Sequence, residues 1–147
     1  IDIVLLSYQD NMLSITLNPV EILQIFLVSL PAVLGIANIM LANNICDIED
    51  DIVNKRYTLP IYIGKEKALK LFKILYNIAY VDILILLFLR VLPLTSALVI
   101  LTFPIVNKNI RVFFGEQTKK NTFVLSVKNF LILNVTGVLA LSIGLLL

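Results

Sequence analysis

The sequence predicts an all-α protein, a bundle of about four transmembrane helices that forms a single domain over residues 1–147. Hydrophobic residues make up 59% of the chain, charged residues only 15%, and the mean hydropathy is +0.97. A soluble domain needs more charge than this to cover its surface. The apolar residues also form runs that are long enough to cross a bilayer. We therefore expect a multi-pass protein of the cell membrane, surrounded by lipid.

The first span is the clearest one in the sequence. No residue from Ile22 to Ala42 is charged, and a helix of that length rises about 31 Å, close to the thickness of the hydrocarbon core. A second span is expected from about Leu71 to Leu92. A further span, the fourth, is expected from about Phe123 to Leu147. Each of these two is interrupted by one ionisable residue, Asp82 or Lys128.

The third span is predicted to be short or bent. It runs from Leu94 to Val106, with Pro93 before it and Pro104 within it. Proline removes a backbone hydrogen-bond donor and bends a helix. A short helix packed against its neighbours accommodates both prolines.

Basic residues predict the orientation in the membrane. Most lysines and arginines lie in the loop before the second span and in the loop before the fourth, and such loops face the cytoplasm. The net charge of +2 is too small to suggest a nucleic-acid partner. Cys46 is the sole cysteine, so no disulfide is expected. Four tyrosines are interpreted as interfacial aromatics: Tyr57, Tyr62, Tyr76 and Tyr80.

A cluster of four carboxylates follows the first span, at residues 47–51. Removing a carboxylate from water costs several kcal/mol unless a cation or a proton compensates. Four carboxylates at the end of a span therefore indicate a functional site and not a contribution to stability. On a helix Asp47 and Asp51 project from one face, with Asp50 beside them. Oxygen ligands without any histidine favour a hard cation such as Mg²⁺, which takes one or two protein carboxylates. The alternative is an ordinary solvated loop.

Other polar residues near the cluster have two interpretations. Lys55 and Arg56 follow the carboxylates closely, so a metal and an anion can be held side by side, as a metal-bound diphosphate requires. Asn43 and Asn44 either cap the helix end or contact the substrate or metal. Asp82 lies within a span, where an ionisable residue is a functional candidate by default. It has no cation partner at helical spacing and could be protonated, lie near the outer interface, or pair with a part of the protein that is absent from this sequence.

At these residues the chain resembles the UbiA superfamily of intramembrane prenyltransferases, and most of all its menaquinone branch, the 1,4-dihydroxy-2-naphthoate polyprenyltransferases. The second aspartate-rich motif of that branch runs Asn-Asn-x-x-Asp-x-x-x-Asp, followed by a basic pair, Thr-Leu and Gly. The matching residues are Asn43, Asn44, Asp47, Asp51, Lys55, Arg56, Thr58, Leu59 and Gly64. Cys46 departs from the family pattern, because many members carry arginine before the first aspartate.

The resemblance implies that this chain is the C-terminal half of a nine-helix fold whose missing N-terminal half carries a first aspartate-rich motif. It implies transfer of a polyprenyl group from a polyprenyl diphosphate to an aromatic acceptor such as 1,4-dihydroxy-2-naphthoate, in menaquinone biosynthesis. The implied Mg²⁺ ligands are Asp47, Asp51 and Asp50, of which Asp47 and Asp51 are the catalytic residues; the implied substrate-binding residues are Asn43, Asn44, Lys55 and Arg56. The alternative is a non-catalytic membrane module or a segment of an ion-coupled transporter.

Overall fold

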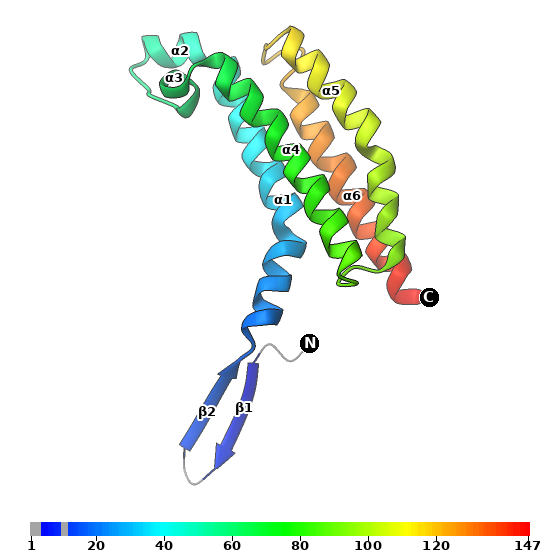
Figure 1. Cartoon of the computed structure of the whole chain (residues 1–147). Coiled ribbons are helices and arrows are strands. Elements are labelled where there is room, and N and C mark those ends of the chain that lie inside the picture. The colour runs from blue at the N-terminus through cyan, green and yellow to red at the C-terminus, as the bar shows by residue number, and fades with distance from the viewer. Residues whose placement is uncertain (1–3, 10–11) are drawn as a thin grey trace.

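Helices dominate the molecule (Figure 1). The computed structural model describes the backbone of residues 4–9 and 12–147 and the side chains of residues 18–147. Within that part, four helical segments are long and apolar enough to cross a membrane: Pro19–Cys46, Lys65–Phe88, Leu94–Gly115 and Val124–Leu146. The predicted all-α, multi-pass bundle is therefore confirmed.

Helix α1, Pro19–Cys46, is longer at both ends than the predicted first span. It begins at Asn18, whose side-chain oxygen accepts the backbone N–H groups of Val20 at 3.1 Å and Glu21 at 3.4 Å. The first N–H groups of a helix have no partner within the helix. The asparagine side chain accepts hydrogen bonds from two of them, and the proline that follows has no N–H, so this pair of residues is a strong helix start. Hydropathy alone predicted a later start for this helix, because Glu21 is charged.

Two short helices, α2 (Ile48–Val53) and α3 (Leu59–Ile63), connect α1 to helix α4, Lys65–Phe88. Gly64, with φ +84°, separates α3 from α4, a conformation that glycine adopts without steric cost. Helix α4 starts and ends earlier than the predicted second span. Its end is a Schellman turn in which the N–H of Val91 donates to the Leu86 carbonyl and Arg90 adopts φ +57°.

The third membrane segment changes helix type along its length. It consists of a 3₁₀ helix, η1 (Leu94–Thr102), and an α-helix, α5 (Phe103–Gly115). Pro104 lies in the first turn of α5, where a missing N–H leaves no hydrogen bond unmade. The segment is longer than the predicted Leu94–Val106, because α5 continues through Lys108 and Arg111, both of which are exposed.

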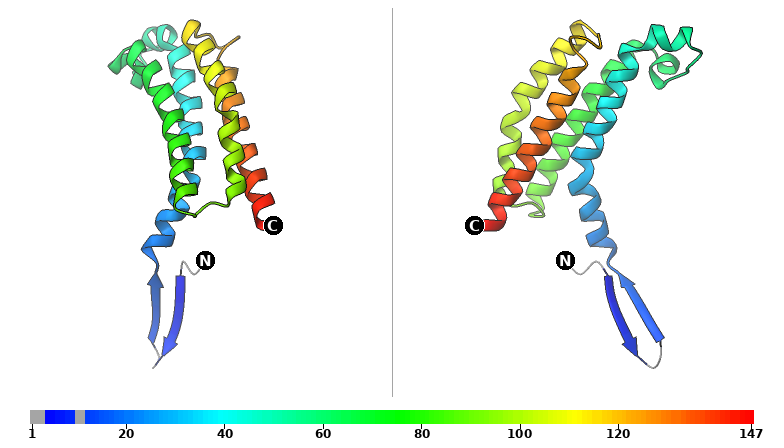
Figure 2. Two further views of the ribbon diagram at one scale, coloured as in Figure 1. Left: turned by 45° about the vertical axis from the view of Figure 1, so that its right-hand side comes forward. Right: turned by 180° about the vertical axis from the view of Figure 1, so that it is seen from behind.

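Helix α6, Val124–Leu146, completes the bundle and packs on η1, α1 and α5. Figures 1 and 2 show α1 antiparallel to α4, and α5 antiparallel to α6. Small residues allow the close approaches: a Cβ on Gly35 would lie 2.7 Å from Cδ2 of Phe130, so α1 and α6 cross closely there. The largest fully buried side chains include Phe72, Tyr76 and Phe113.

Two tyrosines correct the prediction from the sequence. Tyr76 and Tyr80 are only 2% and 4% exposed and lie inside the bundle, so their interpretation as interfacial aromatics is wrong. The Tyr76 hydroxyl donates to the Ser126 carbonyl at 3.3 Å, and the hydroxyls of Tyr80 and Thr102 lie 2.8 Å apart. These hydrogen bonds satisfy polar atoms that would otherwise be costly to bury.

A β-hairpin precedes α1 and was not predicted. Strand β1, Val4–Gln9, pairs antiparallel with β2, Met12–Leu17, in the register Val4 to Leu17 and Gln9 to Met12. The sequence of β2 alternates apolar with small polar residues, a signal for a strand that hydropathy averaging hides. The hairpin lies beyond the N-terminal end of α1, away from α2 and α3 (Figure 2).

Candidate functional site

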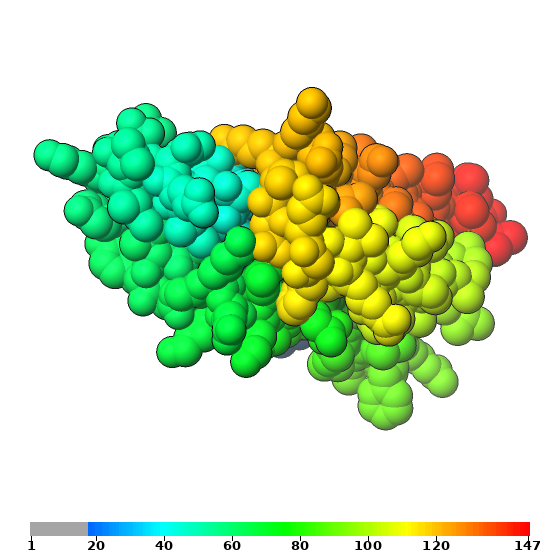
Figure 3. Space-filling model, turned by 90° about the horizontal axis from the view of Figure 1, so that it is seen from above, coloured from blue at the N-terminus to red at the C-terminus, as the bar shows by residue number. Residues whose placement is uncertain are grey.

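The predicted site lies at the C-terminal end of α1. This end of the bundle also carries α2, α3 and the loop between α5 and α6, which lies beside residues of the α1–α2 junction (Figures 1 and 3). The N–H of Asp47 donates to the Asn43 carbonyl at 3.1 Å, and the N–H of Asp51 to the Asp47 carbonyl at 2.8 Å. The two aspartates are therefore one helical turn apart, as their spacing predicts.

Asp47 binds a cation from a distant part of the chain. The ammonium nitrogen of Lys119, in the loop between α5 and α6, lies 2.6 Å from Oδ2 of Asp47. The side-chain amide of Asn43 donates to the same oxygen at 3.2 Å. The Asp47 side chain is 13% exposed and that of Lys119 is 57% exposed. The carboxylate is thus shielded, while the ammonium reaches it from the solvent side.

Three carboxylates act together on Lys119. The pKa of Lys119 is raised above its usual value, first by its hydrogen bond to Asp47 and then by the negative charges of Asp47, Asp50 and Asp51. All three predicted metal ligands therefore contribute negative potential at one point. Such a point attracts a cation more strongly than any one of the three carboxylates would alone.

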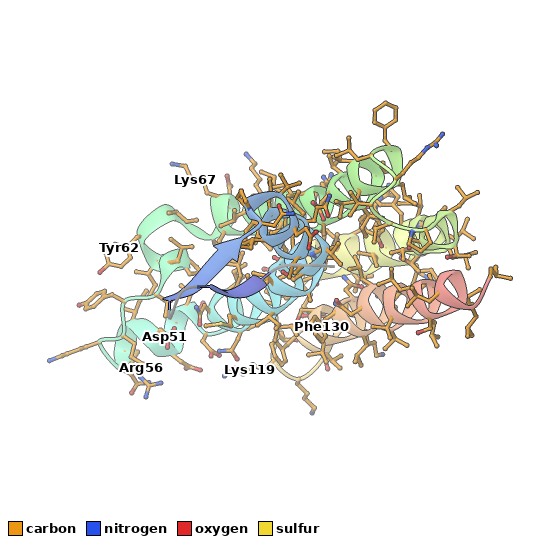
Figure 4. The ribbon with its side chains drawn as sticks, turned by 90° about the horizontal axis from the view of Figure 1, so that it is seen from below. Asp51, Arg56, Tyr62, Lys67, Lys119 and Phe130 are labelled. Atoms are coloured by element: carbon orange, nitrogen blue, oxygen red, sulfur yellow. The ribbon has the colours of Figure 1, made fainter. Side chains whose placement is uncertain are left out.

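Asp51 is held by the turn that follows it. The residue is 8% exposed, and its Oδ2 accepts a hydrogen bond from the Thr58 hydroxyl at 3.3 Å. Helix α2 ends in a Schellman turn, in which the N–H of Arg56 donates to the Asp51 carbonyl at 2.8 Å and Lys55 adopts φ +55°. Both basic side chains are exposed. In Figure 4, which is seen from below, Asp51, Arg56 and Lys119 lie toward the lower left and Lys67 lies above them.

Asp50 faces a separate polar cavity. The cavity has a volume of about 210 Å³, and its polar lining residues are Cys46, Glu49, Asp50, Lys65 and Gln117. In the described part of the chain, no group of three His, Cys, Asp or Glu side chains is arranged to hold a metal ion. The carboxylate and amide oxygens nevertheless suit Mg²⁺, which binds through one or two carboxylates and takes its other ligands from water and phosphate.

The structure adds residues that the sequence analysis left out of the site. Lys119 and Lys65 served there only to predict the orientation, and Gln117 was not considered. The contact between Lys119 and Asp47 depends on how α6 packs on α1, so no local sequence signal could reveal it. Asn44, at the position after Asn43, is half-buried.

Asp82 lies apart from this site. It is 6% exposed, and its Oδ2 has no hydrogen-bond partner among the described residues. With Asn77 and Leu30 it lines an open cavity of about 360 Å³ between α1 and α4. Asp82 is seventeen residues beyond Lys65, so it lies about 25 Å along α4 from the acidic end.

No protein-family model matches the chain, and no curated protein or solved structure is similar to it. A functional proposal for it therefore rests on the geometry of the acidic end of α1 and on the sequence of residues 43–64.

Proposed function

We propose that the chain carries the second aspartate-rich motif of an intramembrane prenyltransferase, as its resemblance to the UbiA superfamily implies. The reaction transfers a polyprenyl group from its diphosphate to an aromatic acceptor such as 1,4-dihydroxy-2-naphthoate, at the cytoplasmic face of the cell membrane. One observation carries the proposal. Asp47 and Asp51 lie one turn apart at the end of a membrane-spanning helix, with basic side chains on the turn that follows and on the opposite loop.

Asp47 and Asp51 would hold the metal, and Asp50 adds negative charge beside them. Bound Mg²⁺ would stabilise the negative charge of the departing pyrophosphate. The chain itself orients both carboxylates, since Asn43 donates to Asp47 and Thr58 donates to Asp51. Fixed orientation matters because each ligand must meet the metal at a short, well-defined distance.

Arg56 and Lys55 would bind the diphosphate oxygens that the metal leaves free. Both side chains are exposed at the turn after Asp51, so nothing in the described structure already occupies them. The planar guanidinium of Arg56 can bind two phosphate oxygens at once, whereas Lys55 supplies a point charge. Asn44, which is half-buried on the last turn of α1, is the remaining substrate contact that the motif implies.

The reaction needs a water-free, apolar environment for the isoprenoid chain. An apolar cavity of about 200 Å³ lies among α1, α4, η1 and α6, about 25 Å along α4 from the acidic end, where it would hold a distal part of a long isoprenoid tail; its lining residues include Pro31, Ile83, Val99 and Leu133. In the proposed step the allylic C–O bond breaks and pyrophosphate leaves. A ring carbon of the acceptor then forms the new C–C bond and the ring loses a proton. Exclusion of water protects the allylic cation from hydrolysis.

The substitution Asp47→Asn tests the proposal, because it keeps the shape of the side chain and removes its charge. The assay measures prenyl transfer in membranes by a protein in which this chain accompanies the first aspartate-rich motif that the resemblance implies. We expect turnover to fall about a hundredfold or more, in line with the roughly 3 kcal/mol lost with a transition-state electrostatic contact. Glu49→Gln is the matched control and should keep most of the activity, since Glu49 is exposed and is not part of the motif. Full activity of Asp47→Asn with unchanged Mg²⁺ dependence would contradict the proposal.

A further inference from the structure

The loop between α5 and α6 holds a lysine beside the acidic end of α1. The N–H of Thr118 donates to the Thr122 hydroxyl at 2.9 Å, and that hydroxyl lies 3.2 Å from the Thr118 carbonyl. Thr122 is only 3% exposed. The side-chain amide of Asn121 donates to Glu116 at 3.4 Å. These hydrogen bonds fix the backbone on both sides of Lys119.

The end of α5 is fixed in the same way. The side-chain amide of Gln117 donates to the carbonyls of Phe113 at 2.7 Å and Phe114 at 2.9 Å, which satisfies two acceptors at the end of the helix. The loop therefore has a defined shape. Lys119 and Lys120 follow each other in it, yet within the described residues only Lys119 forms an ion pair.

Lys119 contacts the carboxylate that would hold a metal ion at Asp47. The ammonium and the Asn43 amide both meet Oδ2 of Asp47, so that oxygen already has two donors. A divalent cation bound to this carboxylate would also repel the ammonium, because like charges a few ångströms apart destabilise each other. The metal and the ammonium therefore compete for Asp47.

Building on the proposed function, we propose that Lys119 is an exchangeable counter-ion of the site. It neutralises Asp47 while no metal is bound, leaves when a divalent cation arrives, and then binds the phosphate anion held beside that cation. The Asp47 side chain is only 13% exposed, so a cation beside it offsets part of its lost hydration. Lys119 is more than half exposed on a flexible four-carbon stem, so its ammonium can move without any change in the loop.

The test compares Lys119→Met with Lys120→Met, which remove the same charge from neighbouring positions. The complete protein in nanodiscs is titrated with Mn²⁺, followed by electron paramagnetic resonance. The Mn²⁺-loaded protein is then titrated with inorganic pyrophosphate in a calorimeter. We expect Lys119→Met to bind Mn²⁺ about fivefold more tightly than Lys120→Met, because the exposed ion pair no longer competes with the metal. Its affinity for pyrophosphate should fall by a similar factor, and Lys119→Arg should restore both affinities.

The outcomes separate this inference from the proposed function. Equal affinities of the two methionine variants in either titration would overturn the inference alone and leave the metal site standing. Asp47→Asn should weaken Mn²⁺ binding. If the unaltered protein and all its variants fail to bind Mn²⁺, the proposed function is wrong about the metal site. The inference about Lys119 is then wrong as well.

Discussion

The two ends of the bundle are held together by different kinds of contact. At the acidic end, α1 meets the α5–α6 loop through an ion pair in which Lys119 is 57% exposed. At the opposite end, α6 meets η1 through close packing. A Cβ on Gly144 would lie 2.6 Å from the ring of Pro93, and the Thr95 hydroxyl donates to the Ala140 carbonyl at 2.7 Å.

We link the ion pair at the acidic end to function and the close packing at the opposite end to stability. A polar contact at the surface contributes little to the free energy of unfolding, so it can be broken and remade when a ligand binds. A close-packed contact leaves no space for an added atom and contributes to stability through its fit. Substitutions at the acidic end should therefore alter catalysis, and substitutions at the opposite end should alter stability.

The largest effect on stability is expected from Gly144→Ala. The new methyl group would also lie 2.5 Å from Oγ1 of Thr95, and the rigid ring of Pro93 cannot turn away, so α6 must shift. We expect the free energy of unfolding to fall by about 1–3 kcal/mol, as in other overpacked interiors. Unfolding in mixed micelles measures it. Gly137→Ala is the control, because a Cβ there meets no atom within 4 Å; equal destabilisation by both variants would contradict the comparison.

A smaller effect, confined to substrate binding, is expected from Arg56→Lys at the acidic end. Lysine keeps the charge and loses the bidentate contact with phosphate. We expect the KM for the polyprenyl diphosphate to rise roughly tenfold, which corresponds to about 1.4 kcal/mol, with the KM of the aromatic acceptor nearly unchanged. Titration of each substrate separately decides it. A rise in the acceptor's KM instead would place Arg56 in the aromatic pocket.

The smallest effect is expected from Asp82→Asn, between the two ends. Asp82 lies about 25 Å along α4 from the acidic end, too far to contact the diphosphate. Asparagine keeps its size and a hydrogen-bonding group, so kcat and KM should stay within about twofold, less than the 1.4 kcal/mol that a tenfold change requires. Steady-state kinetics measure both. A large loss of turnover would contradict the placement of Asp82 outside the site.

Most of the fold could be predicted from the sequence, because transmembrane helices are determined by long local runs of apolar residues. The four spans follow from hydropathy, and Pro93 and Pro104 mark where the third one begins and where it changes from a 3₁₀ helix to an α-helix. The hairpin was missed because its alternating pattern is short. The buried tyrosines were misjudged because hydropathy does not say which side of a helix faces its neighbours.

The sequence by itself determined the positions of Asp47 and Asp51 at the end of a span, their spacing of one turn, and the basic pair that follows, since all of these depend on local chain geometry. Tertiary structure alone decided that Lys119 binds Asp47, that Tyr76 and Tyr80 lie inside the bundle, and that Asp82 has no partner among the described residues. Each of these depends on how one helix packs against another. Such packing brings together residues far apart in the chain, and no local pattern encodes it.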